Sequence, residues 1–232
     1  MTEEERKQIF LAHTDNLKEL KTAWKIVNRS INSALVKNDP ITVDIHTKTL
    51  ALIYCCIVEA SFSKNILTPH TYNTFEIFQI KHASKNNLLA GWKKALDLAL
   101  RKINAQKSNH IPNVRRKIYG LIDTYVLEPS VIRNKLAHGQ WHTALNRENN
   151  ALNSDLTSQI NGLNVIDLVK HQKAYEKLNQ IFEDIIESPN KAHMRDYWHH
   201  INELEQEQIK MSSWTIQRKV NALKRKTRRS HR

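Results

Sequence analysis

The chain has 232 residues, enough for one large domain or for one domain with an appendage. Its four glycines, five prolines and scarce alternation of β-branched residues argue against a β-rich protein and favour an all-α fold. The net charge of +13 predicts a polyanionic partner, either nucleic acid or an anionic membrane surface.

Two long helices are expected at the N-terminus. Apolar residues recur at helical spacing over 3–37, and Asn38-Asp39-Pro40 then breaks the pattern. A second helix is predicted from Thr42 or Asp44 to about residue 64. Its middle, 50–58, is apolar on all sides, which is typical of a buried helix, and it carries Cys55 and Cys56 as an inert pair. Glu59 then either points outward or needs a buried partner.

The region 65–87 is expected to be a connector with a short helical piece, followed by helices over 88–105 and 113–127. The second of these helices carries the basic cluster Arg115, Arg116 and Lys117. Such a cluster is either a solvated face or a phosphate-binding surface.

A short helix after residue 128 holds the most informative residues. Pro129 suits its first turn and Gly139 suits its end. Ile132 and Leu136 would anchor the helix to a core, whereas Asn134 and His138 share another face.

The run from Arg133 to His138 resembles the signature of the HEPN family of α-helical ribonucleases: an arginine, a polar residue, three more residues and a histidine. The resemblance implies a HEPN-like helical bundle and a metal-independent endoribonuclease without cofactors. It also implies that Glu59 orients Arg133 through a charge-assisted pair. Members typically act in toxin–antitoxin systems or antiviral defence, so an antitoxin or defence-system protein is an expected partner.

These residue types suit RNA cleavage by the ribose 2′-OH. Histidine transfers protons near neutral pH, arginine stabilises the phosphate charge, and the Asn134 amide can bind phosphate or orient His138. Residues 133 and 138 are separated by about 140° around an ideal helix, so their side chains diverge. A composite site in a homodimer would bring two such pairs together. The alternative is that Arg133 forms a structural ion pair and His138 merely ends a helix.

Two other arginine–histidine pairs have similar spacing. Arg6 precedes His13 but is followed by Lys7, whereas Arg195 is followed by Asp196 and remains a rival with His200. A metal site at the histidines 193, 199 and 200 is disfavoured because no cysteine or suitably spaced carboxylate accompanies them. Motifs of P-loop, dinucleotide-binding, nucleophile-elbow and HExxH enzymes are missing.

The C-terminal part is expected to contain a small β-hairpin within 140–163, with arms near 141–145 and 156–160. Helices should follow from Asn164 or Asp167 to 187 and over about 191–210, and then a basic helix over 214–232. We therefore divide the chain into a HEPN-like domain, 1–187, and a helical extension with a basic tail, 188–232.

Residues 212–232 contain eight lysines and arginines and no acid, which leaves a charge of +5 on the rest of the chain. The residues expected to contact RNA are Lys135 and the cluster at 115–117, together with Arg218, Lys219, Lys224, Arg225, Lys226, Arg228 and Arg229. Two other interpretations remain open: a non-catalytic HEPN-like module that binds RNA or protein, and a DNA- or membrane-binding helical protein that acts through the tail.

The acidic, polar start and the short apolar run at 50–58 predict neither a signal peptide nor a membrane span. The expected protein is soluble, reduced and cytoplasmic.

Overall fold

The computed structural model describes residues 1–85, 87–105 and 107–230, with side chains described as far as residue 226. It confirms the all-α prediction, because 79% of the chain is helical and no strand forms among the described residues. The elements in chain order are α1 Glu3–Lys37, α2 Pro40–Ile66, α3 Thr74–Ser84, α4 Leu88–Leu100, α5 His110–Ile122, the π-helical turn η1 Asp123–Leu127, α6 Glu128–Ala137, α7 Ser154–Asn161, α8 Val165–Glu187, α9 Ala192–Ser212 and α10 Ile216–Ser230.

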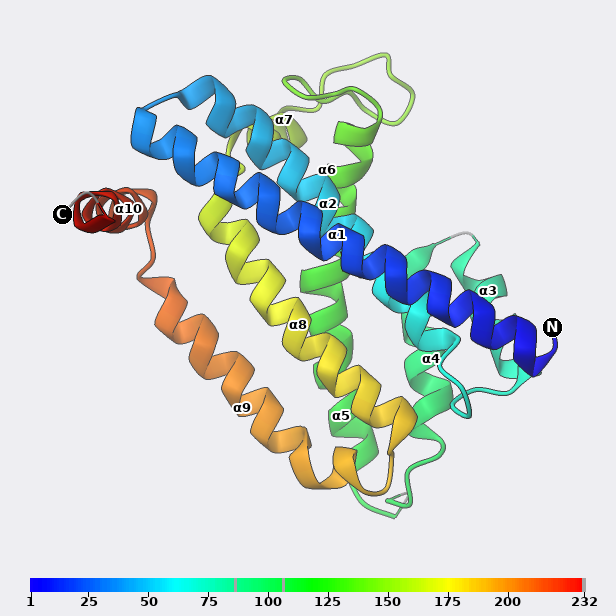
Figure 1. Cartoon of the computed structure of the whole chain (residues 1–232). Helices are drawn as coiled ribbons and strands as arrows, with labels where there is room; N and C mark the ends of the chain where they lie inside the picture. The colour runs from blue at the N-terminus through cyan, green and yellow to red at the C-terminus, as the bar shows by residue number, and fades with distance from the viewer. Residues whose placement is uncertain (86, 106, 231–232) are drawn as a thin grey trace.

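The helices α1 and α2 form a long antiparallel hairpin along one side of the molecule (Figure 1). Asn38 ends α1 in the left-handed conformation, with φ of 58°. The Asp39 carboxylate then accepts a hydrogen bond from the Thr42 backbone N–H at 3.1 Å. Because Asp39 caps the helix and Pro40 suits its first position, α2 begins slightly earlier than the sequence predicted.

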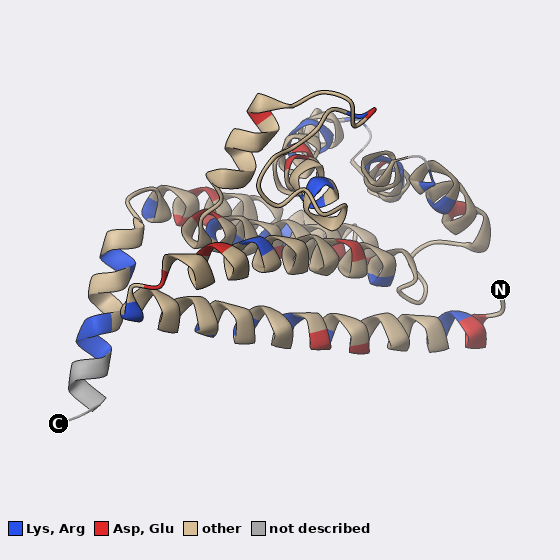
Figure 2. Ribbon diagram, turned by 90° about the horizontal axis from the view of Figure 1, so that it is seen from above, with Lys and Arg blue, Asp and Glu red and all other residues tan. Residues whose placement is uncertain are grey.

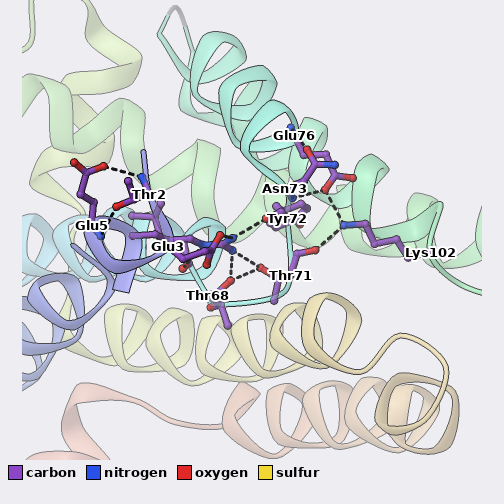
Figure 3. Close-up of polar contacts among 11 residues, drawn as sticks. Thr2, Glu3, Glu5, Thr68, Thr71, Tyr72, Asn73, Glu76 and Lys102 are labelled. Carbon is purple, nitrogen blue, oxygen red and sulfur yellow. Dashed lines mark hydrogen bonds and ion pairs between the residues drawn. The ribbon is translucent and has the colours of Figure 1, made fainter. Parts of the chain in front are cut away.

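Arg6 links the first turn of α1 to the loop after α2, in which Figure 3 labels Thr68, Thr71 and Tyr72. Its guanidinium donates to the carbonyls of Leu67 at 3.0 Å and Tyr72 at 2.8 Å, and also to that of Thr68. The side chain is only 4% exposed. A buried charge is tolerated here because these carbonyls and the nearby Glu3 carboxylate surround it.

The main hydrophobic core lies between α2, α4, α5, α8 and α9, with Trp92 fully buried at its centre. Phe62 and Phe182 flank this indole, with ring centroids 4.8 and 4.9 Å away. Tyr197, Ile201 and Leu204 of α9 belong to the same core. The boundary that we expected between residues 187 and 188 therefore does not coincide with a break in the core.

A second hydrophobic cluster positions the region around α6. It contains Leu50 and Ala51 of α2, Leu136 of α6 and Leu168 of α8, and Ile216 at the start of α10 packs against it. The helix α6 is thus held by a hydrophobic cluster distinct from the main core.

The expected β-hairpin is wrong in its second arm, because Ser154–Asn161 form α7. The Asn153 side chain caps this helix by accepting from the Leu156 backbone N–H at 2.9 Å. Leu145 and Leu152 form only an isolated antiparallel bridge. A five-residue apolar pattern does not distinguish a strand from a helix. Here the Asn153 cap favours the helix.

Two other predicted boundaries differ from the structure. The helix predicted over 88–105 is α4, and it ends at Leu100. The helix predicted over 113–127 begins earlier, because α5 starts at His110. A π-helical turn also separates α5 from α6. Its Tyr125 carbonyl accepts a hydrogen bond from the buried Tyr54 hydroxyl at 2.7 Å, which joins the turn to α2.

The whole of α2 is long and apolar enough to cross a membrane, although the uninterrupted apolar run within it is short. In the structure it packs against α1, α6 and α8. Leu50, Tyr54 and Ile57 are buried by these contacts. These contacts make α2 one of the helices that build the core of the bundle.

Candidate active site

The helix α6 ends as the sequence predicted. Gly139 has φ of +79°, and its N–H donates to the Leu136 carbonyl at 3.1 Å. The Gln140 N–H donates to the Lys135 carbonyl at 3.0 Å, which completes a Schellman motif. His138 consequently lies at the helix end with an exposed side chain. Leu136 is 1% exposed and anchors the opposite face of α6.

Arg133 forms an ion pair with Glu59 of α2. Its Nη2 lies 2.9 Å from Oε1 and 3.0 Å from Oε2 of that carboxylate. Both side chains are about one-third exposed, at 30% for Arg133 and 38% for Glu59. The Glu59 carboxylate thus holds the Arg133 guanidinium at the surface. Part of the guanidinium stays accessible to a ligand.

Asn134 lies beside this ion pair, and its Oδ1 accepts from Nη1 of Arg133 at 3.1 Å. Asn134 and His138 are both exposed. Among the described contacts, Arg133 is bonded to Glu59 and Asn134 and not to His138. The described contacts therefore show no direct interaction between Arg133 and His138.

An open groove of about 670 Å³ lies between α1 and α2, and Glu59 forms part of its wall. Cys56 and His13 also line it. Burial, and secondarily the positive charge of Lys81, lowers the pKa of His13. The sequence suggested His13 only as a partner of Arg6. The packing of α1 against α2 instead places His13 in the same groove as Glu59, which the local pattern around His13 does not indicate.

The adjacent cysteines lie on the same helix. Cys55 is buried, which raises the pKa of its thiol to about 12, whereas Cys56 is half-buried and its pKa is raised less. Neither forms a disulfide. The environment of Cys55 disfavours the reactive thiolate, as expected of an inert residue.

The basic cluster on α5 is partly neutralised. Arg115 pairs with Asp97 at 2.8 Å and Lys117 pairs with Glu205 of α9, whereas Arg116 is exposed and contacts the Asn113 amide. In α6, the Lys135 ammonium is half-buried and donates to the Leu145 carbonyl at 2.6 Å. Arg116 is therefore the member of these four cations that is most open to a phosphate.

The predicted basic tail forms α10, and Figure 2 shows lysines and arginines along this helix, away from the bundle. Arg218, Lys224, Arg225 and Lys226 are exposed. Lys219 is half-buried, and burial together with the charge of Lys226 lowers its pKa. The side chains of Arg228 and Arg229 lie outside the described part of the chain.

The two rival pairs have different environments. Arg6 is a buried structural residue, as described above. Arg195 is 77% exposed and bonded to its neighbour Asp196, whereas His200 is turned inward toward Asp184 and Glu203. Among the contacts of the described residues, neither arginine is hydrogen-bonded to a carboxylate of another helix as Arg133 is to Glu59.

Comparisons of the chain with protein-family models, with curated proteins and with solved structures found no match.

Proposed function

We propose that the chain is a metal-independent endoribonuclease of the HEPN kind that cleaves RNA by attack of the ribose 2′-OH. The observation that carries the proposal is the ion pair between Arg133 and Glu59, which joins the signature helix to a carboxylate 74 residues away in the sequence. Arg133 stabilises the phosphate charge, His138 transfers the proton and Asn134 assists. Glu59 acts as a positioning residue. Biologically, we propose a toxin or antiviral-defence effector, with an antitoxin or another defence protein as partner.

The active site in this proposal is shared between two copies of the chain. Arg133 pairs with Glu59, and His138 is exposed at the helix end and about 140° around an ideal helix from Arg133, which supports a site built from two copies. A two-fold axis beside α6 would oppose two arginines and two histidines. Sedimentation equilibrium at micromolar concentration tests this arrangement, since a monomer that still cleaves RNA would refute the composite site.

The decisive experiment is a cleavage assay on purified protein with EDTA present. His138→Ala should lose about 10²–10⁴-fold in rate while remaining folded. Arg133→Ala should lose cleavage rate to a similar extent. Arg133→Lys should recover little of the rate, because lysine does not form bidentate hydrogen bonds to two phosphate oxygens. DNA should resist cleavage because it lacks the 2′-OH, and the RNA product should carry a 2′,3′-cyclic phosphate or its opened form.

Matched controls come from the rival pair. Arg195→Ala and His200→Ala should leave the cleavage rate unchanged in folded protein. Loss of cleavage in His200→Ala, with wild-type activity in His138→Ala, would show that the other arginine–histidine pair is the active one. Loss of wild-type cleavage in EDTA would refute the metal-independent mechanism.

A non-catalytic HEPN-like module that binds RNA or protein is the second candidate function. It is favoured by the Arg133 guanidinium being already bonded to Glu59 and Asn134. RNA binding that weakens in Arg133→Ala, without cleavage by the wild type under any condition, would support this candidate.

A further inference from the structure

Three potential metal ligands from two helices converge near the turn between α8 and α9. Asp196 and His200 lie one turn apart on α9, and Asp184 faces them from α8. One ligand atom from each lies within 4.8 Å of the other two. The sequence prediction that no suitably spaced carboxylate accompanies the histidines of α9 is wrong, because Asp196 lies four residues before His200. The third potential ligand comes from α8.

We propose that Asp184, Asp196 and His200 bind a divalent transition-metal ion of the zinc class. Two carboxylates and one imidazole form a ligand set that zinc accepts, with water completing the coordination. Nε2 of His200 lies 3.3 Å from Oδ2 of Asp184. Two ligands of a tetrahedral ion are separated by roughly 3.3–3.5 Å when the bonds to the metal are about 2.0–2.2 Å long. These two atoms therefore already have the required spacing, and an Asp196 carboxylate oxygen lies within 4.8 Å of both.

The second nitrogen of His200 supports the assignment. Its Nδ1 faces the Glu203 carboxylate at 3.5 Å, and Glu203 also accepts from Lys177 at 2.7 Å. With a metal ion bound at Nε2, a proton on Nδ1 would be directed at Glu203. Histidines that bind metals are typically oriented by such a carboxylate on the opposite nitrogen.

The local charges also favour a cation. His200 is 8% exposed, and both aspartates are about three-quarters buried. Arg195 neutralises Asp196 through bonds at 2.7 and 2.8 Å, but its side chain is 77% exposed and is able to swing into solvent. A divalent ion would balance both carboxylates and release Arg195.

The bound ion would cross-link α8 and α9 immediately beside the turn that joins them. Its ligands are distinct from the residues proposed for cleavage, so its expected effect is on stability. At a free zinc concentration about 100 times the dissociation constant, the thermal midpoint should rise by about 5–10 °C.

The test is isothermal titration of the chelator-treated full-length protein with zinc chloride, together with thermal unfolding. We expect one saturable ion per chain and at least a tenfold loss of affinity in Asp184→Asn and in His200→Ala. Arg195→Ala should bind zinc at least as tightly as the wild type, because the competing cation is gone. Circular dichroism checks folding, and Asp184→Asn, which conserves size, decides the question if His200→Ala does not fold.

The control addresses the other close histidine pair. His110 and His193 have their Nε2 atoms 3.0 Å apart, so they offer a rival zinc site. The proposal expects His110→Ala to keep wild-type affinity. It is overturned if the wild type shows no saturable binding, if Asp184→Asn retains full affinity, or if His110→Ala abolishes binding. Because the readout is zinc binding, these outcomes are independent of whether the protein cleaves RNA.

Discussion

Replacing Arg6 by methionine should destabilise the protein strongly without affecting the chemistry of cleavage. Methionine retains much of the apolar length of the side chain but donates no hydrogen bonds. The buried carbonyls of Leu67, Thr68 and Tyr72 would lose their shared donor. The ion pair with Glu3 adds little, because that carboxylate is 71% exposed and screened by solvent.

The magnitude follows from these contacts. A hydrogen bond to a charged group contributes about 1.5–3 kcal/mol, and each buried carbonyl left without a donor costs about 1–3 kcal/mol. These effects overlap, and water entering the site recovers part of the loss. We therefore expect the free energy of unfolding to fall by about 3–5 kcal/mol, in the range measured for broken buried charge networks. The thermal midpoint should fall by about 10 °C for a chain of this size.

Thermal unfolding followed by circular dichroism measures the effect, with Arg29→Met as the control. Arg29 lies on the same helix with an exposed side chain. Its replacement removes the same charge and should change the midpoint by no more than about 1–2 °C. Equal midpoints for Arg6→Met and Arg29→Met would refute the structural role of Arg6. At temperatures where Arg6→Met remains folded, its rate of RNA cleavage should match that of the wild type.

Three further predictions test other parts of the molecule. Glu59→Gln should keep the fold but lower kcat/KM for RNA about two- to fivefold, because the partly exposed ion pair with Arg133 contributes roughly 0.5–1 kcal/mol, and an unchanged value would remove Glu59 from the site. Truncation after Ser213 should weaken RNA binding and flatten the dependence of log affinity on log salt, whereas an unchanged slope would show that α10 makes no phosphate contacts. Burial and the neighbouring His110 lower the pKa of His193 from 6.5 to about 4. The unfolded chain therefore binds a proton on His193 more tightly than the folded chain does. Stability should be complete above about pH 6.5 and should fall toward pH 4, and His193→Leu, but not the exposed His199→Leu, should reduce this slope in thermal unfolding.

The sequence alone determined most of the helical boundaries, because helix ends depend on residues close in the chain. Asn38, Asp39 and Pro40 form the turn between α1 and α2 through a left-handed backbone, a side-chain cap and a fixed φ. Pro129 and Gly139 bound α6 for equally local reasons. Where the local pattern was short, as in α7, the sequence allowed both strand and helix.

The candidate site was only partly predictable from the residues themselves. The spacing of Arg133, Asn134 and His138 is visible in the chain, and the suggestion that Glu59 faces Arg133 came from resemblance to a family. The bond between them depends on how α2 packs against α6. No periodicity within either helix encodes that contact.

Tertiary packing alone assigned the remaining polar residues. It buried Arg6 beneath a loop more than 60 residues away, and it brought Asp184 of α8 to His200 of α9. Local sequence specifies which residues share a helix face, since that depends on backbone geometry. Which faces meet depends on the combined burial of apolar surface from distant segments, and that burial decided the long-range partners of Arg6, Glu59 and Asp184.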